Sequence, residues 1–310
     1  MSFKRFARRL AAATKPAVDA AAGRLAVGLL AVIRRFKRER ISDILGAGMR
    51  RIGPWLPEHR IGRANLAAAF PQMPPEEIER ILAGVWDNLG RLAAEFAFLD
   101  RLRIPEVPDQ PAAVADITYD RATYDRFLRL RSERKPALVF AAHLANWELP
   151  ALVAGVHGLD AVVLYRRPNL GAVADAVMQI RQTSMVQMVP TSLSAPLKLA
   201  RALEAGRLAA MLVDQHYVKG VEVTFFGRRC LANPLIAALA RQIECPIYGT
   251  RVVRLPGHRF RAEISEAIPP VRDAEGRIDV QGTMQAITSV IEGWVREHPE
   301  QWLWLHRRWR

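Results

Sequence analysis

From about residue 136 onward, short apolar runs alternate with segments of helix length, and this alternation constrains the fold more than any other feature. Buried strands have four to eight residues, and the runs fall in that range. Strands alternating with helices predict an α/β fold, with a mixed central sheet flanked by helices on both faces. The expected strands cover residues 137–141, 159–165, 186–189, 208–213, 246–253 and 259–264, and the expected helices cover residues near 150–156, 170–181, 194–204 and 280–297.

The first third of the chain has a different pattern, in which apolar residues recur at helical spacing. One helix is expected over residues 57–70, ending before Pro71. A second is expected to begin at Pro74-Pro75-Glu76-Glu77 and to run to about residue 99, because proline and acidic residues favour a first helical turn. Residues 104–118 are rich in proline and are expected to form a loop. We therefore expect an N-terminal helical region beside the sheet, within a single domain over residues 41–310.

Residues 1–40 are strongly basic, with only Asp19 and Glu39 as acidic residues. Their uninterrupted apolar stretch, residues 25–33, is shorter than the roughly 20 residues that a spanning helix needs. We expect a basic amphipathic helix that lies in the interface of an anionic membrane. A helix packed on the domain with a solvated basic face, or a tilted single span, are the alternatives.

The whole chain of 310 residues is also basic, with a formal net charge of +14, and it is 50% hydrophobic. Such a charge favours an anionic partner, although arginine greatly outnumbers lysine and genomic bias is an alternative cause. No nucleic-acid-binding signature accompanies the charge, so no nucleic-acid partner is expected. Cys230 and Cys245 lie outside any CxxC pattern, which argues against a zinc site or a disulfide framework.

The segment His143-Leu144-Ala145-Asn146-Trp147-Glu148 follows the first expected strand and carries the candidate chemistry. Within one regular helix, a spacing of five would separate His143 and Glu148 by roughly 140°. Pro150 instead favours a helix that begins around residues 146–149, with Asn146 as a cap and His143 in the preceding turn. The carboxylate could then fix the imidazole tautomer and make it a general base. Structural roles for both residues are the alternative, because this spacing alone is a weak motif.

Several segments in one order resemble the late lipid A acyltransferases of the lauroyl and myristoyl type. The resemblance covers roughly residues 40–310, and its closing segment is the most specific. The matching segments are Arg63-Ala64-Asn65-Leu66, Ala69-Phe70-Pro71, His143 to Glu148, Tyr165-Arg166, Leu203-Glu204-Ala205-Gly206, Val213-Asp214-Gln215, Phe225-Phe226-Gly227 and Pro299-Glu300-Gln301-Trp302-Leu303-Trp304-Leu305-His306-Arg307-Arg308-Trp309.

The resemblance implies a fold like that of the glycerolipid acyltransferases and an enzyme at the cytoplasmic face of the inner membrane. Such an enzyme transfers a fatty acyl chain from acyl carrier protein to a hydroxyl of a lipid A precursor. The family's H-x4-D/E motif carries over to His143 and Glu148, as base and supporting carboxylate. No metal and no organic cofactor is expected.

Four further residues are expected to bind substrate. Arg166 matches the family's arginine after the second strand, and Asp214 matches the acidic residue of its Asp-Gln pair. Arg166, Arg181 and Arg254 could bind acceptor phosphates, since arginine forks match phosphate oxygens, or could be ordinary ion-paired arginines. Asp214 could position an arginine or cap a turn. His216 replaces an acidic residue of many relatives, and Leu231-Ala232-Asn233-Pro234 replaces a threonine-rich stretch, which bears on donor and acceptor details.

Two other functions fit the same sequence. The acceptor could be another glycolipid, such as a phosphatidylinositol mannoside, with acyl-CoA as the donor. The chain could also be a basic membrane-binding protein without catalytic activity.

Overall fold

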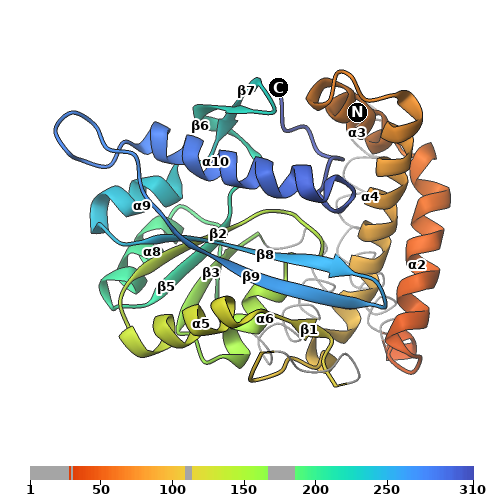
Figure 1. The fold of residues 1–310 in the computed structure, drawn as a ribbon, viewed down its shortest axis with the longest axis horizontal. Coiled ribbons are helices and arrows are strands. Elements are labelled where there is room, and N and C mark those ends of the chain that lie inside the picture. Colours follow the sequence, from red (N-terminus) through yellow and green to blue (C-terminus); the bar gives the residue numbers. More distant parts are fainter. Residues whose placement is uncertain (1–27, 29–30, 109–113, 167–185) are drawn as a thin grey trace, which may run out of the picture.

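A computed structural model describes residues 28, 31–108, 114–166 and 186–310. Within these residues, seven strands form the central sheet and two more form a separate hairpin (Figure 1). The central strands are β1 (Ile117–Thr118), β2 (Ala137–Ala141), β3 (Ala161–Tyr165), β4 (Gln187–Pro190), β5 (Leu208–Leu212), β8 (Ile247–Leu255) and β9 (Arg259–Ile268), and the hairpin consists of β6 (His216–Phe225) and β7 (Arg228–Ala232).

Helices surround the sheet and make up most of residues 31–100. The α-helices are α2 (Arg38–Ile52), α3 (Pro57–Ala69), α4 (Pro75–Glu95), α5 (Arg121–Glu133), α6 (Leu149–Val156), α8 (Ala195–Glu204), α9 (Leu235–Ile243) and α10 (Val280–Glu297), and the short 3-10 helices are η1 (Gly53–Trp55), η2 (Phe96–Arg101) and η3 (Pro299–Gln301). The predicted α/β class, with an N-terminal helical region, is confirmed.

The strand order of the central sheet is β1-β9-β8-β2-β5-β3-β4. Strands β8, β2, β5, β3 and β4 are parallel to one another, whereas β9 is antiparallel to β8 and parallel to β1. The sheet is therefore mixed, as predicted. Because β2 and β5 are parallel neighbours in the middle of the sheet, the residues that follow them meet at the same edge.

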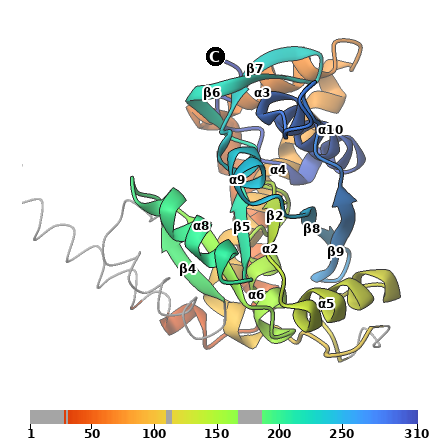
Figure 2. The ribbon, with the colours of Figure 1, turned by 90° about the vertical axis from the view of Figure 1, so that its left-hand side faces the viewer.

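Helices cover both faces of this sheet, with α5 and α6 below it and α10 above it in Figure 1, and Figure 2 shows the same separation. Side chains alternate between the faces along each strand. On β2, Leu138 and Phe140 belong to the core on the α10 side, and Phe140 stacks on Trp294 with ring centroids 5.5 Å apart. Val139 and Ala141 point to the other face, toward α6.

The boundaries show which sequence patterns were informative. The final helix was predicted correctly, and α4 ends at Glu95 and continues as η2, rather than as an α-helix to residue 99. Helix α5 was not predicted, although Asp120 caps it by accepting a hydrogen bond of 2.8 Å from the backbone N–H of Thr123. Its sequence is mostly polar, so apolar residues at helical spacing give only a weak signal. The helix predicted over residues 170–181 lies outside the described residues.

The N-terminal helices pack closely because two glycines allow their backbones to approach. A Cβ on Gly90 of α4 would lie 2.3 Å from the carbonyl oxygen of Leu45 in α2, and a Cβ on Gly46 would lie 2.8 Å from the Asp87 carboxylate. Of the basic segment predicted over residues 1–40, residues 1–27 and 29–30 lie outside the described residues. No helix in the described part of the chain has both the length and the apolar character needed to cross a bilayer.

The C-terminal segment after α10 returns to the middle of the molecule. Trp302 and Trp304 have no exposed surface, and Trp302 forms a β-bridge with Leu144 in the turn after β2. Both tryptophans therefore belong to the hydrophobic core. The segment therefore packs directly against the candidate catalytic turn.

Candidate functional site

The turn between β2 and α6 has the local structure that the sequence predicts. Helix α6 begins at Leu149, directly after Glu148, and Pro150 lies in its first turn. The side chain of Asn146 accepts a hydrogen bond of 3.2 Å from the backbone N–H of Glu148. His143 therefore precedes the helix, and Glu148 lies at its start.

His143 contacts a carboxylate from the neighbouring strand. Its Nδ1 lies 2.7 Å from Oδ1 of Asp214, and its backbone N–H donates to Oδ2 of Asp214 at 2.8 Å. Asp214 follows β5, which pairs in parallel with β2. The indole N–H of Trp302 donates to the same Oδ2, also at 2.8 Å. The backbone N–H of His143 and the indole N–H of Trp302 thus fix this carboxylate against the imidazole.

The Asp214 carboxylate is charged despite its burial. Its side chain is only 1% exposed. Burial by itself would raise the pKa of Asp214, but the attraction and hydrogen bonds of His143 hold that pKa well below its ordinary value. An ionised carboxylate accepts only, so Nδ1 of His143 carries the proton. The lone pair of a neutral imidazole then lies on Nε2, which is 3.3 Å from the side-chain nitrogen of Gln215.

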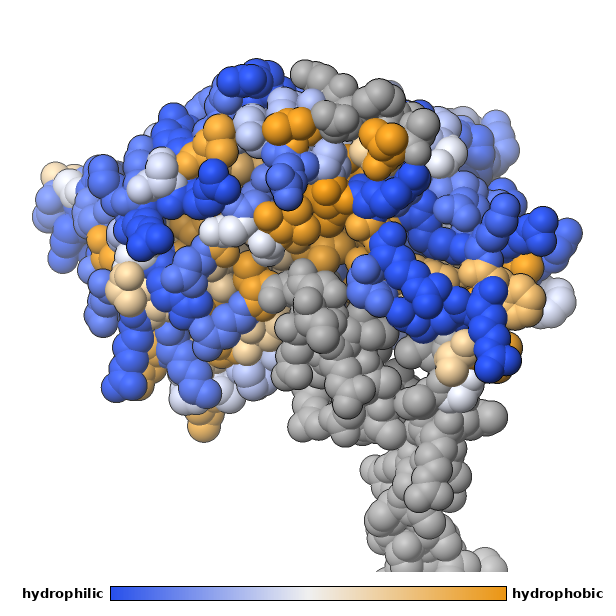
Figure 3. Space-filling view, turned by 90° about the horizontal axis from the view of Figure 1, so that it is seen from below, coloured by the Kyte–Doolittle hydropathy of each residue, from blue (hydrophilic) through white to orange (hydrophobic). Residues whose placement is uncertain are grey.

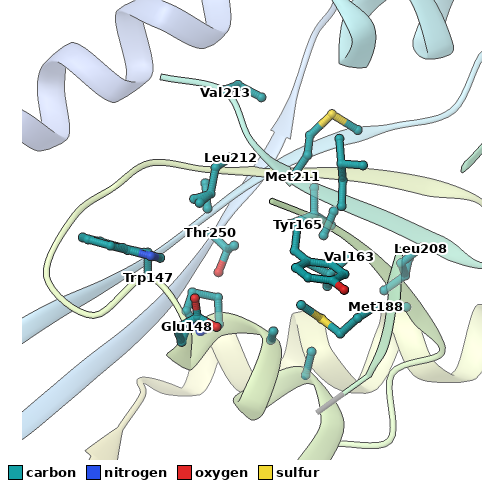
Figure 4. Close-up of a pocket in the computed structure, with 18 of the residues that line it drawn as sticks. Trp147, Glu148, Val163, Tyr165, Met188, Leu208, Met211, Leu212, Val213 and Thr250 are labelled. Atoms are coloured by element: carbon teal, nitrogen blue, oxygen red, sulfur yellow. The ribbon is translucent and has the colours of Figure 1, made fainter. Parts of the chain in front are cut away.

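Glu148 borders the same cavity as His143 and is largely buried (Figure 4). Trp147, between them in the turn, packs its ring edge against the imidazole with centroids 5.0 Å apart. The ring nitrogens of His143 contact Asp214 and Gln215. Support of His143 by Glu148 stays a prediction, and the structure provides a second carboxylate for that role.

The sequence pointed to Asp214 as a site residue but not to its partner. A signal was present, because Asp214 directly follows one predicted buried strand and His143 lies two residues after another. Ends of neighbouring parallel strands meet at one sheet edge. The spacing of apolar residues and the length of each apolar run, however, do not reveal which strands are neighbours. Only the strand order of the sheet places β5 beside β2.

The three predicted arginines have different positions. Arg166 is exposed at the end of β3 and lines the cavity with His143. Arg181 lies outside the described residues. Arg254 lies on β8, where its guanidinium forms an ion pair with Glu95 and donates to Asn88 at 2.8 Å. It is absent from the described residues that line the cavity. Phosphate binding by these arginines stays a prediction.

An apolar cavity of about 490 Å³ extends from His143 along the sheet face covered by α5 and α6. This volume falls within the range of about 300–1,000 Å³ for ligand pockets. At about 3.3 Å per residue, the five residues of β5 extend roughly 13 Å from Leu208 to Leu212, and both ends line the cavity. Apolar side chains of three parallel strands form its floor: Val139, Ala141, Ala161, Val163, Tyr165, Leu208, Ala210 and Leu212.

This arrangement suits general-base chemistry on a substrate with a long apolar part. The imidazole Nε2 can accept a proton at one edge of the sheet. The cavity beside it is lined by apolar side chains that include Val163, Met188 and Leu212 (Figure 4). Among the described residues, no group of three or more His, Cys, Asp or Glu side chains is arranged to hold a metal ion.

Comparisons with known proteins agree with the resemblance of the sequence. The sequence model of the family described as bacterial lipid A biosynthesis acyltransferase matches residues 15–310. The match includes the turn, Asp214, the cavity and the C-terminal segment. A search of curated proteins finds no match.

Proposed function

Because the chain belongs to the family of bacterial lipid A biosynthesis acyltransferases, we propose that this acyltransferase esterifies a hydroxyl of a lipid A precursor with an acyl chain from acyl carrier protein. The observation that carries the proposal is the position of His143. Its imidazole is held by a buried carboxylate and opens onto a long apolar cavity. Such a cavity can hold the acyl chain, and such an imidazole can activate the hydroxyl.

In the proposed mechanism, Nε2 of His143 removes the proton from the acceptor hydroxyl. The alkoxide attacks the thioester carbonyl, the C–S bond breaks, and the ester forms. The imidazolium then returns its proton to the leaving thiolate. Asp214 keeps the Nδ1 proton in place and stabilises the imidazolium, as a carboxylate does beside a catalytic histidine. General-base catalysis of this kind contributes typically about 10²–10⁴-fold in rate.

Glu148 remains a second candidate for the carboxylate that supports His143. Asp214 has the better support, because it lies 2.7 Å from Nδ1 and is held on its other side by Trp302. In this proposal Glu148, in the cavity wall, orients the substrate near His143. Substitution of each carboxylate by its amide separates these roles.

The proposed donor and location follow from charge and exposed apolar surface. Two segments that contribute Thr191 and Tyr217 to the cavity lining continue into exposed apolar side chains, which include Leu197 (55% exposed) and Val218 (73% exposed). The adjacent Lys198 and Lys219 are also exposed. Apolar residues also gather at the surface below the sheet, bordered by hydrophilic ones (Figure 3). We propose that the face seen in Figure 3 rests on the anionic cytoplasmic face of the inner membrane, with acidic acyl carrier protein attracted by the net charge of +14.

A reconstituted assay tests the proposal. Purified protein is incubated with a lipid A precursor in vesicles that contain anionic lipid, with acyl carrier protein thioester or acyl-CoA as the donor. Mass spectrometry should show the mass of one acyl chain added to the precursor, faster with the carrier protein. His143→Ala should abolish the product. If neither donor acylates the precursor, the proposed function is wrong, and faster transfer from acyl-CoA would overturn the proposed donor.

A further inference from the structure

The turn that carries His143 has a backbone conformation that it would not keep on its own. Ala145 has a φ of 48°, in the left-handed region that a residue with a Cβ rarely adopts. Leu144, Ala145 and Asn146 are all buried. Strained residues of this kind persist where the surrounding structure over-determines them. The contacts of the turn therefore show what holds His143 in place.

One set of contacts comes from α4. Asn88 and Glu95 are seven residues apart, about two helical turns, so they share one face of that helix. The Asn88 amide donates to the carbonyl oxygen of Ala145 at 3.3 Å, and the Asn146 amide donates to Oε2 of Glu95 at 2.9 Å. Two polar side chains of α4 thus hold two consecutive residues of the turn.

The side chain of Arg254 in β8 bonds both of these side chains. Its guanidinium forms a two-pronged ion pair with Glu95, one prong at 3.1 Å, and its Nε donates to Oδ1 of Asn88 at 2.8 Å. The side chains of Arg254 and Glu95 are 12% and 3% exposed. One arginine therefore orients both residues that hold the turn.

Gln301 closes the network from the C-terminal segment. Its side chain accepts from the backbone N–H of Arg254 at 2.8 Å and donates to the carbonyl oxygen of Arg254 at 3.1 Å. Its own carbonyl oxygen accepts from the N–H of Ala145 at 2.8 Å. The network thus runs from α4 through β8 and η3 back to the turn.

We propose that Arg254 is a positioning residue for acyl transfer, whose side chain acts through Glu95 and Asn88 on the turn that carries His143. A buried ion pair is often no more stabilising than apolar residues of the same volume, and such pairs can instead serve to specify one conformation. Here the pair fixes a strained turn next to the base. The inference rests on the proposed function, because it assumes that His143 acts in acyl transfer.

The test compares Arg254→Met with Arg251→Met on the same strand. Arg251 is a matched control, because its side chain is 10% exposed and its Nε bonds Glu263 at 2.6 Å, away from the turn. Misplacement of a catalytic group by about 1 Å can lower the rate by 10²-fold. At equal folded fraction, Arg254→Met should lower kcat by about 10- to 100-fold with KM within about twofold. Arg251→Met should leave both near their original values.

Hydrogen exchange gives a readout that needs no substrate. Arg254→Met should speed exchange of the backbone amides of residues 144–146, and Arg251→Met should not. Glu95→Gln, which keeps a hydrogen-bonding side chain but removes the charge, serves if Arg254→Met fails to fold, and it should loosen the same amides. Equal kinetics in the two methionine variants, or unchanged exchange in the turn, would overturn the proposal.

Two further results are distinguishable. A raised KM for a phosphorylated acceptor, with kcat unchanged, would assign Arg254 to phosphate binding and overturn the positioning role. The unsubstituted protein could transfer no acyl chain while Arg254→Met still speeds exchange of the turn amides. That result would contradict the proposed function but leave the control of the turn by Arg254 intact.

Discussion

The two faces of the central sheet are made by alternate residues of the same strands, yet they differ in what they contain. On the α10 side, Phe140 and Ala209 are completely buried in a closed core. On the α6 side, Ala141, Ala161 and Ala210 line the cavity that leads to His143. The three alanines leave volume for a ligand on one face, whereas the Phe140 ring helps to fill the space on the other. The comparison indicates that one face provides stability and the other provides the cavity that we propose as the substrate site.

The largest expected effect is a fall in kcat, caused by a substitution at the sheet edge where the cavity reaches His143. Asp214→Asn should lower kcat by about 10²–10⁴-fold, because an amide cannot hold the Nδ1 proton or stabilise the imidazolium as a carboxylate does. Steady-state kinetics with the carrier-protein thioester would measure this. Glu148→Gln is the matched control and should have a smaller effect on kcat. The reverse order would assign the supporting carboxylate to Glu148.

The next largest expected effect is a loss of stability, caused by a substitution in the closed core on the α10 side of the sheet. Phe140→Ala should lower the free energy of unfolding by about 3–5 kcal/mol, because it removes a buried ring stacked on Trp294 and leaves a cavity. Urea unfolding would measure the loss. The folded fraction should keep a kcat near that of the unsubstituted protein. A large fall in kcat per folded molecule would show that the closed face also controls chemistry.

A pair of neighbouring residues on β5 tests the comparison directly. Ala210→Leu fills part of the cavity and should shift the preferred donor toward shorter acyl chains, by a selectivity change of about 10–200-fold per methylene at most. Ala209→Leu overpacks the closed core instead and should destabilise the fold by about 1–3 kcal/mol without changing chain preference. Competition between donors of different length, analysed by mass spectrometry, measures the preference. The same chain preference in both variants would contradict the assignment of the cavity to the acyl chain.

The smallest expected effect is in the dependence of stability on pH. The pKa of Asp214 is lowered in the folded protein, so its charge contributes stability above the ordinary aspartate pKa of about 3.9. That contribution is lost only as the pH falls through the lower folded pKa. The difference in unfolding free energy between the unsubstituted protein and Asp214→Asn should therefore stay constant from about pH 5 to 8 and shrink below about pH 4. Denaturant unfolding over a pH series checks this, and a difference that shrinks already near pH 6 would contradict it.

The sequence by itself determined the fold class and the local structure of the catalytic turn. Short apolar runs and helical spacing marked β2 and α10 correctly, because both are local properties of the sequence. Pro150 and Asn146 placed His143 before α6 and Glu148 at its start, because caps and prolines act within a few residues. Helix α5 was missed because its polar sequence gives little of that local signal.

Only the tertiary structure decided which groups meet. Asp214 reaches His143 because β5 lies beside β2, and strand order depends on packing across the whole sheet rather than on any one segment. Trp302, which donates to Asp214, and Arg254, which donates to Asn88, lie far from residues 143–148 in the sequence. A sequence pattern reports the face on which a side chain lies, but long-range packing selects its partner, and the carboxylate at Nδ1 of His143 is a partner of that kind.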